Sequence, residues 1–178
     1  MKNLERAATL PCWSGPVIPR PMGGGITNVN YAVEDRGRKF VVRIGDDIPV
    51  HHILRWHEKA ASHAAAKAGL SPAIIYDAPG VMVMDFIEGD AFTEEDVQDP
   101  RNLNALALLL KRAHTELMLH LNGPALAFWP FHLNRDYLAR LTRERSRHAS
   151  RLATMMAINQ KLEVALGRSE ERRVGKEC

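Results

Sequence analysis

The chain has 178 residues, of which 46% are apolar and 25% charged, and its formal net charge is +3. This composition is normal for a folded globular protein and excludes a chain that is disordered throughout. The most basic stretch, Arg168–Lys176, also contains glutamates, and no long basic tract is present. We therefore expect no nucleic-acid partner.

No part of the sequence approaches the ~20 consecutive apolar residues that span a bilayer, so no membrane partner is expected. The two cysteines, Cys12 and Cys178, lie at opposite ends of the chain. They form neither a disulfide framework nor a metal-ligand cluster. Together with the lack of a signal peptide, this usage predicts a cytoplasmic location.

The first half of the chain has the pattern of a β-sheet with helices. A short helix is predicted over Leu4–Leu10, and at most an edge strand at Val17–Ile18. An alanine-rich helix is predicted over His52–Ala68, ended by Gly69. Alternation and apolar runs bounded by turns predict further strands over Asn28–Glu34, Phe40–Ile44, Ala73–Tyr76 and Val81–Ile87.

The second half has the pattern of helices only. They are predicted over Leu103–Leu121, Arg135–Arg147 and Leu152–Leu166. Strands with one main helix, followed by helices, predict an α+β fold with a boundary near Gly89. The expected domains are residues 1–89, residues 90–167 and a polar tail, 168–178.

A glycine loop, Gly23-Gly24-Gly25, precedes the strand at Asn28. A dinucleotide-binding loop would open a helix, and a Walker loop would end in Gly-Lys-Ser/Thr, so neither class fits. A glycine loop between two strands, with a basic residue in the next strand, is the arrangement of kinases. An ordinary glycine-rich hairpin turn is the alternative.

Several segments together resemble choline kinase-type and aminoglycoside phosphotransferases, which have a protein-kinase-like fold. The segments are Gly24–Tyr31, similar to a GG-x-T-N-x-x-Y loop; Phe40–Ile44 with its arginine; Arg55–Glu58, similar to Arg-x-x-Glu; Ala68–Pro72, similar to A-G-L-x-P; Met84–Gly89; and Leu109–His114. Their order and spacing cover about residues 15 to 135. An arginine at position 43 favours the choline kinase branch over the aminoglycoside branch, where lysine is more common.

The resemblance implies a role for each site residue. The backbone amides of Gly24, Gly25 and Ile26 would cover the phosphates of ATP, and Thr27 and Asn28 would shape that loop. Arg43 would pair with phosphate oxygens, and Glu58 would orient Arg43 through an ion pair. A hinge of Asp85, Phe86 and Ile87 would meet the adenine.

Plainer interpretations of the same residues stay open. Arg43 could be a solvent-facing strand residue and Glu58 a surface charge. His114 fits a packing role better than a catalytic one. The histidines at 51, 52, 57 and 63 lack the i, i+4 spacing of helix-borne ligands, so no metal site is predicted.

The catalytic motifs of the family are absent from this sequence. His-x-Asp, whose Asp accepts the hydroxyl proton, occurs nowhere, and neither does the later Asp-Phe-Glu or Asp-Trp-Glu that binds Mg²⁺. We therefore predict no catalytic residues and no turnover by this chain alone, since a missing base costs about 10²–10⁴ in rate. Mg²⁺ would be a cofactor of the intact enzyme only.

The sequence thus predicts part of an ATP-dependent phosphotransferase that acts on a small-molecule alcohol such as choline, ethanolamine or thiamine. We expect a truncated chain with a foreign tail, although a natural short protein is the alternative. In a truncated chain, the helices after Gly89 would expose apolar faces and favour self-association. The rival function is a nucleotide-binding or interaction module without catalysis.

Overall fold

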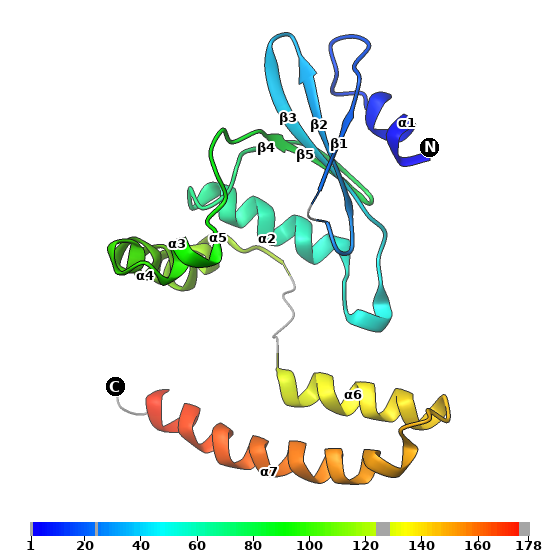
Figure 1. Ribbon diagram of the computed structural model, residues 1–178, viewed down its shortest axis with the longest axis vertical. Coiled ribbons are helices and arrows are strands. Elements are labelled where there is room, and N and C mark those ends of the chain that lie inside the picture. The colour runs from blue at the N-terminus through cyan, green and yellow to red at the C-terminus, as the bar shows by residue number, and fades with distance from the viewer. Residues whose placement is uncertain (1, 24, 124–128, 175–178) are drawn as a thin grey trace. The chain divides into compact units, whose positions relative to one another are not determined.

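The computed structural model describes residues 2–23, 25–123 and 129–174, with side chains up to Leu166. The chain divides into two compact units, Met1–Ala125 and Leu126–Cys178. The first unit contains every strand and five α-helices of the described chain, and the second contains two helices (Figure 1). The predicted α+β class is confirmed. No helix among the described residues is long and apolar enough to cross a membrane.

The first unit is built on a five-stranded antiparallel sheet in the order β1-β2-β3-β5-β4. The strands are β1 Arg20–Met22, β2 Val29–Asp35, β3 Arg38–Ile44, β4 Ile74–Ala78 and β5 Val81–Asp85. The predicted strand at Val17–Ile18 is wrong. Val17 packs on the core and Ile18 is exposed, while the edge strand forms two residues later.

Alternation along β3 separates two faces of the sheet. Phe40, Val42 and Ile44 are buried in a core with Val81 and Val83, while Val41 and Arg43 face the other way. Helix α1, Lys2–Ala8, and the residues after it cover the core face. The opposite face lies toward helix α2, Arg55–Lys67, as Figure 1 shows. Arg43 therefore leaves the core and points toward α2.

Helix α2 begins later than predicted. A short 3₁₀ turn, Pro49–His51, precedes it, and His52 has a left-handed backbone (φ 55°) that ends that turn. The helix starts at Arg55, whose amide donates to Asp47 Oδ1 at 2.6 Å. A carboxylate at this helix end is favourable because it faces the positive end of the helix dipole.

The helix predicted over Leu103–Leu121 is split in two. Helix α4, Pro100–Thr115, is capped by the Asp99 side chain, and α5, Leu117–His120, follows after Glu116. Helix α3, Glu94–Gln98, was not predicted, although Thr93 and Asp96 form a capping box that could have revealed it. On α4, Leu103, Leu108 and Leu110 are exposed.

The first unit extends past the boundary that the sequence suggested near Gly89. Helix α4 contacts the C-terminal end of α2, where Arg112 Nη2 donates to the Ala68 carbonyl at 2.7 Å. This bond satisfies a helix-end carbonyl that α2 itself cannot use. The boundary near Gly89, expected from the change from strands to helices, therefore remains a proposal.

The second unit is a pair of helices, α6 Pro130–Arg143 and α7 Ala149–Val174. Asn159 is buried between them, where it donates to the Phe131 carbonyl at 3.0 Å and accepts from Asn134 at 2.9 Å. Helix α7 continues through Val174, beyond the predicted end at Leu166. Of the predicted tail, residues 175–178 lie outside the described part of the chain.

Replacement of Val42 by alanine tests the sheet core. Val42 is completely buried beside Arg43, so loss of two methyl groups should lower the free energy of unfolding by about 2 kcal/mol. Urea denaturation measures this change. The matched control is Val97→Ala, at a side chain that is 53% exposed, which should change the free energy by less than about 0.5 kcal/mol.

Candidate functional site

Two of the residues singled out in the sequence, Arg43 and Glu58, come together on the α2 side of the sheet. Arg43 lies near the end of β3 and Glu58 on the first turn of α2. Their side chains form an ion pair, with Arg43 Nη1 at 2.9 Å from Glu58 Oε1. The Arg43 side chain is 35% exposed and that of Glu58 23%, so the pair is partly buried. Neither residue is an isolated surface charge.

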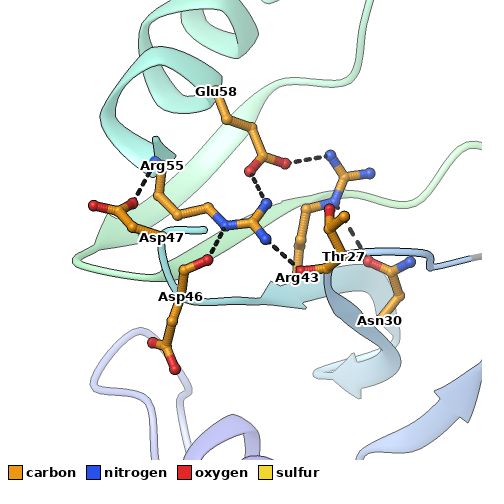
Figure 2. Close-up of polar contacts among 7 residues, drawn as sticks. All are labelled: Thr27, Asn30, Arg43, Asp46, Asp47, Arg55 and Glu58. Atoms are coloured by element: carbon orange, nitrogen blue, oxygen red, sulfur yellow. Dashed lines mark hydrogen bonds and ion pairs between the residues drawn. The ribbon is translucent and has the colours of Figure 1, made fainter. Parts of the chain in front are cut away.

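A second arginine shares the same carboxylate. Arg55 Nη1 lies 2.6 Å from Glu58 Oε2, and the Arg55 side chain is only 12% exposed. Glu58 is therefore held between two guanidinium groups, as Figure 2 shows. The three side chains together carry one net positive charge.

Asn30 supports Arg43 from the neighbouring strand. The two residues are direct partners in the register of β2 and β3, and Arg43 Nε lies 3.4 Å from Asn30 Oδ1. A residue of β3 is thus fixed from two directions, by Asn30 across the sheet and by Glu58 from the helix. The sequence motif contained Asn30, but its part in holding Arg43 was not predicted.

The glycine loop lies between β1 and β2, as predicted from the sequence. Gly24 lies outside the described residues. A Cβ atom on Gly25 would lie 2.1 Å from the Asn28 carbonyl oxygen, so this position needs glycine. The Ile26 side chain is 99% exposed. The loop is therefore closed by Gly25 against Asn28, with Ile26 projecting outward.

Thr27 connects this loop to the charged residues. Its carbonyl oxygen accepts a hydrogen bond from Arg55 Nη2 (Figure 2). The structure thereby joins Thr27, Arg43 and Glu58 into one network, with Arg55 at its centre.

The hinge segment lies at the other end of β5. Asp85 pairs with Phe40 across the sheet and Arg43 with Met82, three residues away, which is about 10 Å along the strands. The Asp85 amide donates to Ala73 and the Phe86 amide to Lys39. Within the described residues no backbone hydrogen bond from the Ile87 amide is found. If this segment binds a base edge through an amide, Ile87 must provide it.

A cavity of about 610 Å³ adjoins the arginine pair. It lies between the start of α2, the loop after β3 and the turn between β4 and β5, and Arg43, Arg55 and Glu58 all line it. This volume is within the ordinary range of small-molecule sites. Among the described residues, no group of three or more His, Cys, Asp or Glu side chains could hold a metal ion.

No family model and no curated protein sequence matches this chain. Solved structures, in contrast, do match this chain. An ethanolamine kinase from Plasmodium vivax matches with a TM-score of 0.57 at 22% identity, over 72% of this chain and 38% of its own. A choline/ethanolamine kinase family protein from Mesorhizobium loti matches with a TM-score of 0.56 at 27% identity, over 79% of this chain and 45% of its own.

A choline kinase from Cryptosporidium parvum gives a TM-score of 0.61 at 16% identity, over 83% of this chain and 44% of its own. The chain thus spans less than half the length of each of these three structures. They show that it has the fold of a choline kinase-like N-terminal lobe followed by part of the helical lobe. The resemblance to aminoglycoside phosphotransferases stays a prediction.

The position of α2 on the sheet depends partly on a second charged cluster. Asp77 of β4 accepts from His63 Nε2 at 2.8 Å and forms an ion pair with Lys59. Burial alone would raise the pKa of Asp77, but the hydrogen bonds from Lys59 and His63 outweigh it, and the pKa falls below its ordinary value of 3.8.

This depressed pKa predicts how acid affects stability. The Asp77 contribution should be fully present above the ordinary value of 3.8 and be lost as pH falls through the lower folded value. Asp77→Asn should therefore be less stable than the parent near neutrality, and the difference should shrink below about pH 4. Urea denaturation across this range tests it, with Asp90→Asn, at an exposed loop position, as the control. A difference that stays constant with pH would contradict the assignment.

Proposed function

We propose that this chain carries the ATP-binding part of a phosphotransferase of the choline/ethanolamine kinase type, whose intact form phosphorylates a small-molecule hydroxyl. The observation that carries the proposal is the Arg43–Glu58 ion pair beside a glycine loop enclosed by antiparallel strands. In kinases, a basic residue on the third strand and a glutamate on the following helix form such a pair. The choline/ethanolamine kinase structures of the same fold support the choice of acceptor class.

Arg43 can bind phosphate while it stays paired. A guanidinium has five N–H donors, and among the described residues only Nη1 and Nε have partners, in Glu58 and Asn30. The remaining donors are available on a side chain that is 35% exposed. A planar fork fixed on two sides is suited to bidentate contact with phosphate oxygens. Glu58 would act by orienting the fork, not by touching the nucleotide.

The glycine loop and hinge complete the nucleotide site in this proposal. The amides of Gly24, Gly25 and Ile26 would lie over the phosphates, because a glycine loop allows close backbone approach. Thr27 and Asn28 would fix the loop, through the Arg55 bond and the Gly25 contact. Adenine would lie at Asp85–Ile87, with the Ile87 amide as donor. The acceptor alcohol would be choline, ethanolamine or a related small molecule.

The sequence lacks the Asp-Phe-Glu or Asp-Trp-Glu motif that binds Mg²⁺ in the family it resembles, and no group of three or more metal-ligating side chains occurs among the described residues. The sequence also offers no His-x-Asp to accept the hydroxyl proton. We therefore assign to this chain nucleotide binding and no step of phosphoryl transfer. These same facts favour a second candidate, a nucleotide-binding module without catalysis. Formation of phosphocholine by this chain from Mg-ATP and choline would exclude that candidate.

Nucleotide affinity of the full chain tests the role of Arg43. Arg43→Ala should weaken ATP binding by roughly tenfold to a hundredfold, because charge-assisted hydrogen bonds are lost. Arg43→Lys should recover only part, since an ammonium lacks the fork. Isothermal titration calorimetry measures both. Arg101→Ala is the control, because Arg101 is 89% exposed and pairs only with Asp99 among the described residues.

The variant Glu58→Gln distinguishes an orienting role of Glu58 from a direct effect of its negative charge on ATP binding. Removal of a negative charge beside the phosphates would by itself strengthen ATP binding. If Glu58 acts by holding Arg43, the variant should instead bind about threefold to tenfold more weakly. Equal or tighter binding by Glu58→Gln would contradict the orienting role, and unchanged binding by Arg43→Ala would contradict the nucleotide site.

A further inference from the structure

We propose that Arg55 is a positioning residue that holds the glycine loop against the Arg43–Glu58 pair. Its guanidinium joins the glycine loop, the segment after β3 and the first turn of α2. Nη2 donates to the Thr27 carbonyl of the glycine loop, Nε to the Asp46 carbonyl at 2.9 Å after β3, and Nη1 to Glu58 at 2.6 Å. Figure 2 shows these bonds extending from one side chain.

The surroundings of Arg55 are built for this geometry. Gly45 follows β3 directly, and a Cβ atom there would lie 2.7 Å from Arg55 Nη2 and 2.9 Å from its Cζ. The same Cβ would lie 3.1 Å from Asn28 Cβ, so a larger residue would crowd both the guanidinium and the glycine loop. The Arg55 side chain is 12% exposed, so few water molecules can replace its bonds. A planar group with donors in fixed directions can reach all three acceptors, whereas a lysine cannot.

The chemical consequence is that loop position and arginine orientation depend on each other. Glu58 Oε2 binds Arg55 and Glu58 Oε1 binds Arg43, so the carboxylate transmits the position of one guanidinium to the other. If the loop moves outward, the hydrogen bond between Arg55 and the Thr27 carbonyl breaks. The Arg55 guanidinium, which holds Glu58, then keeps two of its three hydrogen-bond partners. The link to nucleotide affinity rests on the proposed function, while the link to loop order does not.

Arg112 provides a matched comparison. It also joins α2 to another element by a bond to a backbone carbonyl, at Ala68, and it also pairs with a glutamate, Glu116. It acts at the opposite end of α2 from the glycine loop. An arginine that merely stabilises the first unit should behave like Arg112. A positioning residue should have an effect on residues 25–30 that Arg112 lacks.

The test compares hydrogen–deuterium exchange of the full chain without nucleotide for Arg55→Ala, Arg55→Lys, Gly45→Ala and Arg112→Ala. We expect amide exchange in Val29 and Asn30, the first strand residues after the loop, to rise at least about fivefold in Arg55→Ala and Gly45→Ala, and to change little in Arg112→Ala. Arg55→Lys should rescue only part of the protection. Gly45→Ala crowds the guanidinium without removing its charge, but it also crowds Asn28 of the loop. Arg55→Lys leaves Gly45 and Asn28 unchanged, so it isolates the fork geometry and keeps the test valid if Arg55→Ala fails to fold.

Unchanged loop exchange in Gly45→Ala, or full rescue by Arg55→Lys, would overturn the proposal, because either result would mean that the fork geometry is not needed. Equal loop exchange in Arg112→Ala would overturn it as well. ATP affinity is then measured on the same variants, and roughly tenfold weaker binding is expected for Gly45→Ala. If the loop responds as expected but the parent chain binds no ATP, the proposed function fails and the positioning role stands.

Discussion

The site depends on one carboxylate held between two guanidinium groups. Glu58 takes Arg43 on one oxygen and Arg55 on the other, and both arginines are partly withdrawn from solvent. A charge in such a place is costly unless it is paired and hydrogen-bonded, so each member needs the others. The loop after β3, the glycine loop and the first turn of α2 are all attached to this cluster.

Side chains along β3 point alternately to the two faces of the sheet, and this alternation places Arg43 in the cluster. Phe40, Val42 and Ile44 enter the core, so the residue between the last two must face α2. Register then places Asn30 beside Arg43, and the hinge segment about 10 Å farther along β5. The places of Arg43, Asn30 and the hinge segment therefore follow from the pairing of β2, β3 and β5.

The sequence predicted the main strands and α2 because their apolar periodicity is strong. It misplaced the edge strand at Val17–Ile18, since the apolar pair packs on the core while the paired backbone is Arg20–Met22. It did not show that Glu116 splits the helix predicted to reach Leu121. Arg43 and Glu58 were singled out through family resemblance, and the structure brings them together. The role of Arg55 was missed because two of its partners are backbone carbonyls, of Thr27 and Asp46, which no side-chain pattern reveals.

The most direct test of the account is a structure of this chain with a non-hydrolysable ATP analogue. The account predicts phosphate oxygens within hydrogen-bonding distance of the Arg43 guanidinium, with the Arg43–Glu58 and Glu58–Arg55 bonds intact and the adenine at Asp85–Ile87. A nucleotide bound elsewhere, or bound with Arg43 turned away from the phosphates, would contradict it.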